Sequence, residues 1–226
     1  MTAQAPPRPV TTHGDADAAP YEHLGGAERY LHLSRDRDLL ALLGRHGVAD
    51  LSGQRILELG CGEGSLLRSL LHYGAEAGKL AGVDVDQAKV GRARVSLAGV
   101  RLAVADIASL PYQDEAFDVA FAFTTFSSVL VGDTRRRGAL EALRVLRPGG
   151  LLVVYDFWLN PLNSRVRPLR AGELRALFAP RAVEMERVTL APPIVRALGG
   201  RRSLCAPLDR LSLLRTHLLA AVVKES

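Results

Sequence analysis

Three glycines separate two apolar segments in the stretch from residue 56 to residue 67, ILELGCGEGSLL. Gly60, Gly62 and Gly64 allow the backbone to turn tightly and let a bound molecule approach the main chain. A helix that begins directly after them offers unpaired N–H groups and a partial positive charge, which suit an anionic group. The stretch therefore predicts a buried strand, a ligand-binding loop and a helix, an arrangement typical of the carboxyl edge of open α/β sheets.

The rest of the chain alternates between strand-like and helix-like patterns. The expected strands cover residues 55–59, 80–85, 100–105, 117–123, 151–157, 183–190 and 214–223. The expected helices cover residues 65–73, 86–98, 134–146 and 171–179, with helical turns over 192–213. This alternation indicates an α/β protein with a doubly wound, mostly parallel, seven-stranded sheet and helices on both faces. We expect Pro148-Gly149-Gly150 to stop the helix that precedes them.

Length and composition indicate one domain. The chain has 226 residues, and residues 1–20, rich in Pro, Thr, Ala and Asp, are expected to form a disordered tail. Within a single domain of residues 21–226, we expect a helical lid over 21–50, a ligand-binding core over 54–157 and a separate C-terminal part over 158–226. No apolar run reaches about 18 residues, which argues against a membrane-spanning helix. Two cysteines cannot form a disulfide framework, so we expect a cytoplasmic protein.

The spacing of the glycines argues against a dinucleotide. The dinucleotide fingerprint has its third glycine three positions after the second, where this chain has Ser65. The chain instead has G-x-G-x-G, with Glu58 two positions before the first glycine. Asp84 lies 20 residues after Gly64, at the end of the second expected strand, where a carboxylate can accept hydrogen bonds from ribose hydroxyls. We assign the neighbouring Asp86 to the N-cap of the next helix.

Three further motifs follow in order: VADI at residues 104–107, DEAFDVAFAF at 114–123 and LRVLRPGGLLVVYDF at 143–157. Together with the glycine loop and the second strand, they resemble the class I S-adenosylmethionine-dependent methyltransferases, in particular the broad group that acts on small molecules. The resemblance covers residues 54–157. It implies a Rossmann-like α/β fold and S-adenosyl-L-methionine as the cofactor.

The resemblance also implies a set of cofactor-binding residues. The glycines would line the methionine part of the cofactor, and Glu58 would help to hold its amine side. Asp84 would bind the ribose, Val85 would pack on the adenine, and Asp106 and Ile107 would contact the adenine edge. The full expected set is Glu58, Gly60, Cys61, Gly62, Gly64, Asp84, Val85, Asp106, Ile107, Phe123 and Tyr30.

Three members of this set have less specific roles. Phe123 would close the site near the sulfonium. We interpret Cys61 as a small space filler in the loop rather than as a nucleophile. Tyr30, like Tyr21, would cover the carboxylate of the cofactor, and a plain packing role is the alternative for both.

Methyl transfer from a sulfonium depends mainly on alignment of donor and acceptor, but a hydroxyl acceptor also needs a base. His32, in the expected lid, and Asp156, after the fifth strand, are the candidate catalytic residues. The alternatives are a packing histidine and a carboxylate that caps a turn. We predict no metal site, because Asp156 and Asn160 are too few oxygen ligands and no Cys/His spacing suggests zinc.

The charge is uneven along the chain. Residues 159–226 contain 12 basic and 5 acidic side chains, whereas residues 1–158 contain 17 and 19. Arg165, Arg167 and Arg170 directly follow the fifth strand, on the side where an acceptor would enter. The hypothesis is that they recognise an acidic acceptor, since the planar guanidinium suits carboxylates and phosphates. Solvated loop arginines, or an arginine bias of the genome, are the alternatives.

The sequence thus favours an enzyme that methylates a small molecule, for which the arginines suggest an acidic one, with an oxygen acceptor preferred, in bacterial natural-product or glycolipid-type biosynthesis. Methylation of nitrogen or carbon, of RNA or of a membrane lipid are alternatives. Nucleic acid is disfavoured because none of the 12 aromatic residues interleaves the C-terminal arginines. The apolar, basic stretch from Pro192 to Leu219 would suit a membrane surface. The oligomeric state is left open.

Overall fold

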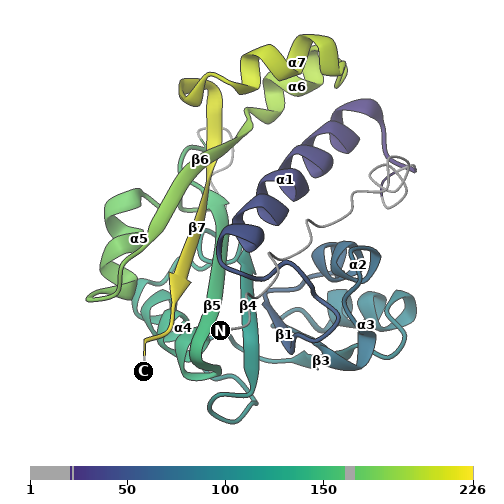
Figure 1. The fold of residues 1–226 in the computed structure, drawn as a ribbon. Helices are drawn as coiled ribbons and strands as arrows, with labels where there is room; N and C mark the ends of the chain where they lie inside the picture. Colours follow the sequence, from purple (N-terminus) through teal and green to yellow (C-terminus); the bar gives the residue numbers. More distant parts are fainter. Residues whose placement is uncertain (1–20, 22, 161–165, 226) are drawn as a thin grey trace, which may run out of the picture.

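The computed structural model describes residues 21, 23–160 and 166–225, so the expected tail and Arg165 lie outside the described residues. Its sheet has seven strands in the order β3-β2-β1-β4-β5-β7-β6 (Figure 1). The strands are β1 Ile56–Leu59, β2 Leu80–Asp84, β3 Arg101–Val104, β4 Phe117–Phe123, β5 Leu146–Phe157, β6 Glu184–Leu190 and β7 Arg215–Val223. The predicted seven-stranded, Rossmann-like sheet is therefore confirmed.

Strand direction fixes which loops meet at one edge. Strands β1 to β5 are parallel to their neighbours, and β7 is antiparallel to both β5 and β6. Because β6 and β5 both oppose β7, β6 runs in the same direction as the parallel strands. The residues that follow β1, β2, β4, β5 and β6 consequently lie on the same side of the sheet.

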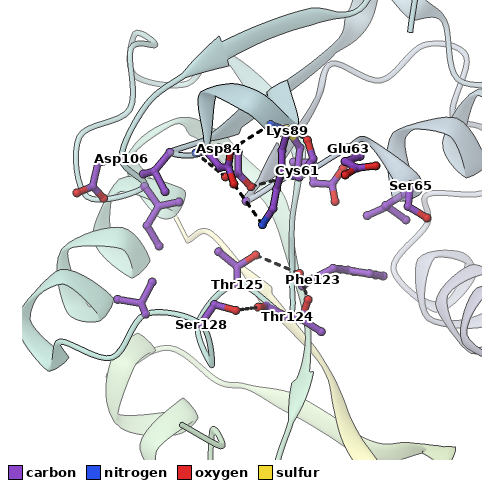
Figure 2. A pocket seen from close by; sticks show the side chains of 18 of the residues that line it. Cys61, Glu63, Ser65, Asp84, Lys89, Asp106, Phe123, Thr124, Thr125 and Ser128 are labelled. Carbon is purple, nitrogen blue, oxygen red and sulfur yellow. Dashed lines mark hydrogen bonds and ion pairs between the residues drawn. The ribbon is translucent and has the colours of Figure 1, made fainter. Parts of the chain in front are cut away.

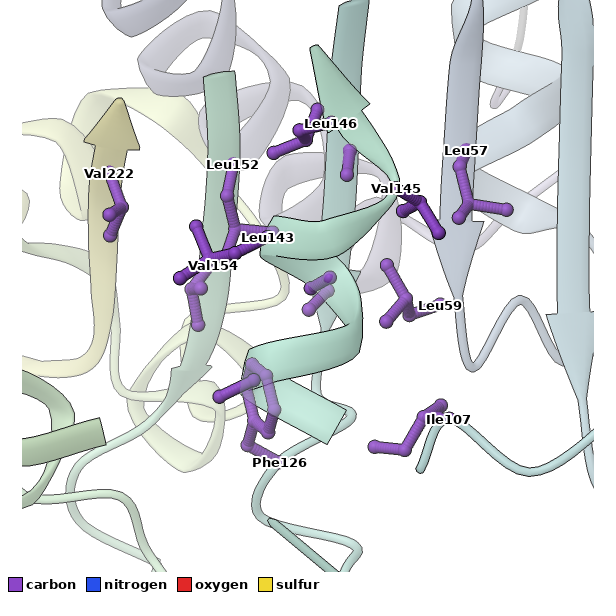
Figure 3. Close-up of a cluster of buried hydrophobic side chains, with 14 of the residues drawn as sticks. Leu57, Leu59, Ile107, Phe126, Leu143, Val145, Leu146, Leu152, Val154 and Val222 are labelled. Carbon is purple, nitrogen blue, oxygen red and sulfur yellow. The ribbon is translucent and has the colours of Figure 1, made fainter. Parts of the chain in front are cut away.

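Helices cover both faces of the sheet, as predicted. The helices α1 Gly26–Arg45, α2 Ser65–His72 and α3 Gln87–Ser96 contribute to one buried apolar cluster. The helix α4 Gly132–Arg144, together with α5 Ala171–Phe178, contributes to a second cluster. Figure 3 shows this second cluster, in which Leu143 of α4 lies among strand residues such as Leu152 and Val154. Alternate side chains of the central strands point to opposite faces, so both clusters draw on the same strands.

The expected helical turns over 192–213 form two short helices and a 3-10 turn. These are α6 Pro192–Ala197, α7 Arg202–Asp209 and η3 Ser212–Leu214; a further 3-10 turn, η2, covers Ala77–Lys79. A third, small apolar cluster joins Val195 of α6 and Cys205 of α7 to Tyr30 and Leu31 of α1. Along the ranges that the structure describes, no helix has both the length and the apolar character needed to cross a membrane.

The boundary near residue 146 differs from the prediction. The helix α4 ends at Arg144, and Pro148-Gly149-Gly150 lies inside β5 instead of stopping the helix. Leu146 already pairs with Phe117, and the register between β4 and β5 then shifts before Leu151 pairs with Val119. Gly149, with a φ of 73°, makes this irregularity possible, and its N–H donates to the carbonyl of Lys224 beyond β7. The Pro-Gly-Gly segment therefore marks an irregularity within a strand and not the end of the helix, so this prediction was wrong.

The glycine loop after β1 is held by close contacts. Gly60 has a φ of 68°, and a Cβ there would lie 2.7 Å from Oγ1 of Thr125. Gly64, at the N-cap of α2, has a φ of 78°, and a Cβ there would collide with Cδ1 of Leu97. Glycine is required at both positions because of the conformation and the lack of space.

We expect Gly64→Ala to lower the free energy of unfolding by about 2 kcal/mol, because alanine must adopt the left-handed conformation and displace Leu97. Gly91 in α3 is the matched control, since it is exposed and a Cβ added there would meet no atom within 4 Å. Gly91→Ala should raise the free energy of unfolding by about 0.5–1 kcal/mol, the helix preference of alanine over glycine. Urea unfolding of both variants measures the difference, and equal effects would contradict the packing described here.

Candidate functional site

A pocket of about 560 Å³ opens where β1, β2 and β4 end, beside the glycine loop (Figure 2). It is lined by Arg35, Glu58, Gly60, Cys61, Gly62, Glu63, Ser65, Leu66, Asp84, Val85, Asp86, Lys89, Asp106, Ile107, Phe123, Thr124, Thr125, Ser128 and Val129. All but two of the predicted cofactor-binding residues are in this set, namely all except Gly64 and Tyr30. Residues from four separate motifs thus meet at one carboxyl edge.

The glycine loop presents its open side to the pocket. The N–H of Cys61 donates to the carbonyl of Val83 at 2.9 Å, which ties the loop to β2. The N–H of Gly62 donates to Oδ2 of Asp84 at 2.8 Å. A Cβ at Gly62 would meet no atom within 4 Å, although the φ of 52° favours glycine. Cys61 is buried, and its side chain lies close to Gly82.

Asp84 is a carboxylate of the pocket that two backbone hydrogen bonds hold in place. In addition to the Gly62 contact, its Oδ1 accepts a hydrogen bond from the N–H of Asp86 at 2.9 Å. Each carboxylate oxygen retains capacity for a further donor. Asp86 caps α3 through the N–H groups of Ala88 and Lys89, as predicted. The two neighbouring acids therefore have different roles. Asp84 can bind a ligand, and Asp86 caps the N-terminus of α3.

Glu58 is a buried acid with one carboxylate oxygen that lacks a partner. It lies on β1 with 4% of its surface exposed, and its Oε2 has no hydrogen-bond partner among the described residues. Burial raises the pKa of the carboxyl group to about 8, while the nearby charge of Arg35 and a backbone hydrogen bond at Leu67 oppose the shift. A cationic or hydrogen-bond-donating ligand in the pocket would satisfy this oxygen.

The far end of the pocket has an apolar surface and one acid. Val85 is 67% exposed there, although it is a large aliphatic side chain. Asp106 accepts a hydrogen bond from the N–H of Ala108, and Ile107 is buried against Gly138 of α4. A flat, partly apolar ligand group fits this combination.

The opposite wall contains residues that the sequence analysis missed. Figure 2 shows Thr124, Thr125 and Ser128 across the pocket from Asp84. Thr125 Oγ1 donates to the carbonyl of Leu59 at 2.7 Å, and Ser128 Oγ donates to that of Thr124. The polar run TTFSS directly after an apolar strand was the available signal for this wall.

Arg35 is a further pocket residue that the sequence analysis missed. It comes from α1, and its guanidinium pairs with Asp36 at 2.7 Å, donates to the hydroxyl of Tyr21 at 2.9 Å and lies 5.8 Å from the ring centre of Phe123. Asp36 in turn accepts hydrogen bonds from Tyr21 and Tyr73. This network brings a cation from the first helix to the pocket wall. The sequence RDRD offered no signal that distinguished Arg35 from an exposed charge.

Tyr30 and His32 lie away from this pocket, which corrects the prediction for both. Tyr30 packs in the cluster with α6 and α7, and its hydroxyl is buried without a partner in the described part of the chain. His32 stacks on Tyr21 with 4.6 Å between ring centres and lines a separate pocket of about 180 Å³. Burial, followed by the charge of Arg35, lowers the pKa of His32 to about 4. The rotation of α1 about its own axis sets the position of both side chains, and this rotation could not be predicted from the sequence.

Asp156 is also turned away from the pocket. It is fully buried, and its two carboxylate oxygens accept hydrogen bonds from the N–H groups of Ser127 and Phe157 at 2.9 and 2.8 Å. Burial raises its pKa to about 6. These contacts match the alternative interpretation, a carboxylate that holds a turn, and not a base that faces an acceptor.

The predicted arginine cluster is only partly described. Arg167 pairs with Glu173 at 3.0 Å, and the same carboxylate binds the buried Arg135 of α4 at 2.6 Å. Arg170 is exposed. Over the described ranges, no group of three or more His, Cys, Asp or Glu side chains is arranged to hold a metal ion.

Comparisons with known proteins agree with this geometry. Residues 57–154 match the family model described as a methyltransferase domain. A "probable S-adenosylmethionine-dependent methyltransferase" of Mycolicibacterium smegmatis is 31% identical over 151 residues, covering 60% of this chain and 54% of the relative. A ubiquinone/menaquinone biosynthesis C-methyltransferase of Azotobacter vinelandii is 38% identical over 119 residues, covering 50% of this chain and 45% of the relative.

A solved structure shares the fold. The S-adenosylmethionine-dependent methyltransferase of Thermotoga maritima, described as a "possible histamine N-methyltransferase", superposes with a TM-score of 0.61 at 20% identity, covering 92% of this chain and 96% of that one. The chain spans about half the length, or less, of the curated relatives it matches.

Proposed function

Because residues 57–154 form a class I S-adenosylmethionine-dependent methyltransferase domain, we propose that the protein transfers a methyl group from S-adenosyl-L-methionine to a small molecule. The observation that carries this proposal is the convergence of Glu58, the glycine loop, Asp84 and Asp106 on one pocket. The cofactor supplies an electrophilic methyl group on a sulfonium, and the task left to the protein is chiefly alignment.

The residues of the pocket fit such a cofactor. We propose that the open side of Gly62 accommodates the methionine part and that the unpaired Oε2 of Glu58 accepts its ammonium group. The free capacity of Asp84 suits the ribose hydroxyls. The exposed Val85 and the neighbouring Asp106 and Ile107 suit the adenine ring and its edge.

We further propose that Arg35, and not Tyr30, binds the carboxylate of the cofactor. Arg35 lines the pocket, and its positive charge is the strongest of those that lower the pKa of Glu58, so one end of the pocket offers both a carboxylate and a guanidinium. A zwitterionic amino-acid group has the matching pair of charges. Helix α1 acts in this proposal as the lid predicted for residues 21–50.

The first candidate for the acceptor atom is oxygen, as the sequence analysis favoured. The second is an activated carbon, which needs less base, because neither His32 nor Asp156 lines the pocket. The Azotobacter vinelandii relative is named as a C-methyltransferase, which also favours carbon as the acceptor atom. Natural-product or glycolipid-type biosynthesis in the cytoplasm remains the proposed setting, and the two free, buried cysteines suit a reducing compartment.

An acidic acceptor remains part of the proposal. Arg170 is exposed close to α5, whereas the guanidinium of Arg167 already pairs with Glu173. Arg165 lies outside the described residues. Fewer arginines are therefore free to bind an acidic acceptor than the sequence suggested.

Calorimetric titration with S-adenosylhomocysteine tests the cofactor proposal. We expect wild-type protein to bind this product and Asp84→Ala to weaken the affinity about 10- to 100-fold, the loss expected for hydrogen bonds to a charged group. Asp133→Ala, which removes an exposed acid of α4 outside the pocket, is the control and should leave affinity unchanged. Absence of binding, or equal affinity in the Asp84 variant, would refute the proposal.

The same titration at different pH values tests the role of Glu58. In the free protein its pKa is about 8, and a bound ammonium group would lower it, so binding releases a proton below that pH. Affinity should rise with pH up to about 8, by at most about tenfold per pH unit, and then level off. Glu58→Gln should abolish this slope. A pH-independent affinity in the wild type would show that Glu58 does not contact the cation.

Product analysis with carbon-13-labelled methyl donor identifies the acceptor atom. We expect an O-methyl product from hydroxylated aromatic acids, and a C-methyl product from a reduced naphthoquinone if carbon is the acceptor. Each acid is compared with its methyl ester, which lacks the negative charge. A higher KM for the ester supports an acidic acceptor, and equal KM values would remove that part of the proposal.

A further inference from the structure

The segment from Arg201 to Leu213, which contains α7 and the start of η3, combines exposed leucines with exposed arginines. Leu213 is 83% exposed and Leu211 is 53% exposed, and only Ser212 separates them in the chain. We call this set the α7 surface; it consists of Leu204, Leu211, Leu213, Arg201, Arg202 and Arg210. Figure 1 shows that α6 and α7 lie together beyond the end of β6, away from the body of the sheet.

Some arginines in the C-terminal third are neutralised by acids, whereas those of the α7 surface are not. Arg196 pairs with Glu28, and Arg215 pairs with Asp209. By contrast, the structure gives the side chains of Arg201, Arg202 and Arg210 no ion pair with any described residue. The only acid between residues 192 and 214 is Asp209, which is buried and bound to Arg37 and Arg215. The surface therefore presents three positive charges and no exposed carboxylate.

The position of this surface relates it to the pocket. The strand β6 runs parallel to β5 and ends at Leu190, so the chain leaves the sheet there on the side where the pocket opens. The helices α6 and α7 follow directly and pack on α1. A flat surface bound to the α7 surface would therefore lie on the side of the molecule from which an acceptor enters the pocket.

We propose that the α7 surface binds the surface of an anionic lipid bilayer. The leucines would enter the boundary between head groups and acyl chains, and the arginines would contact lipid phosphates, the two contributions that hold interfacial helices on membranes. Residues 192–214 contain no aromatic side chain on which nucleic-acid bases could stack.

Co-sedimentation of the full chain with vesicles tests this proposal. The vesicles contain either phosphatidylcholine alone or phosphatidylcholine mixed with phosphatidylglycerol, and neither cofactor nor acceptor is present. We expect binding to the anionic vesicles only, and its loss at 1 M salt, where the screening length falls to about 3 Å. Failure to bind would leave the methyl-transfer proposal standing, because the assay does not depend on it.

Two sets of variants locate the contact. Arg201→Gln/Arg202→Gln/Arg210→Gln should weaken binding to anionic vesicles about a hundredfold, on the basis of about fivefold for each arginine. Leu211→Glu/Leu213→Glu should weaken it at least tenfold. The matched controls replace exposed residues elsewhere: Arg101→Gln/Arg136→Gln/Arg175→Gln for charge, and Val95→Glu/Leu140→Glu for apolar character.

The proposal is supported if both α7 variants lose binding and both controls retain it. It is overturned if the wild type does not bind anionic vesicles, or if the controls lose binding to the same extent. Tighter binding of duplex RNA that excludes vesicles would assign the surface to nucleic acid instead. Self-association that Leu211→Glu/Leu213→Glu abolishes would assign it to a second copy of the chain.

Discussion

The left-handed loop between β1 and α2 is the constraint on which the site depends. Gly60 and Gly64 have no room for a side chain, because Thr125 and Leu97 approach the backbone there. The same loop is hydrogen-bonded to β2 through Cys61 and to Asp84 through Gly62. The ends of three neighbouring strands are therefore held at fixed distances from one backbone segment. A ligand that contacts this backbone is also placed against the carboxylates of β1 and β2.

A second network attaches the first helix to that edge. Asp36 is buried and receives hydrogen bonds from two tyrosines and from Arg35. A buried carboxylate is costly unless its oxygens are satisfied, and these donors satisfy both of them. One of the donors, Tyr21, also shares a short hydrogen bond with Ser69 of α2. The consequence is that α1 has one preferred position, with Arg35 at the pocket and Tyr30 on the other side, against α6 and α7.

The sequence predicted the elements and the glycine loop because these depend on local patterns. Asp84 and Asp106 could be placed because each directly follows a strand, and parallel strands end at a common edge. Residues of α1 could not be placed in the same way. Tyr30 and Arg35 are five positions apart, which is a rotation of about 140° on a helix, so only one of them can face the pocket. Which one does so is decided by the Asp36 network, whose members come from residues 21, 35, 36 and 73.

Asp156 illustrates a similar limit. Its position near the end of β5 correctly placed it at the carboxyl edge, but β-strand neighbours point to opposite faces, and the N–H groups of Ser127 and Phe157 each occupy one of its oxygens. Tertiary contacts also neutralise part of the excess positive charge in the last third of the chain. Arg167, Arg196 and Arg215 are neutralised by acids that lie far away or on another element. Counting charges along the chain overstates the positive field near the acceptor, because pairing removes part of it. Arg201, Arg202 and Arg210 are among the arginines that form no ion pair with a described residue, and at the two ends of α7 they accompany exposed leucines.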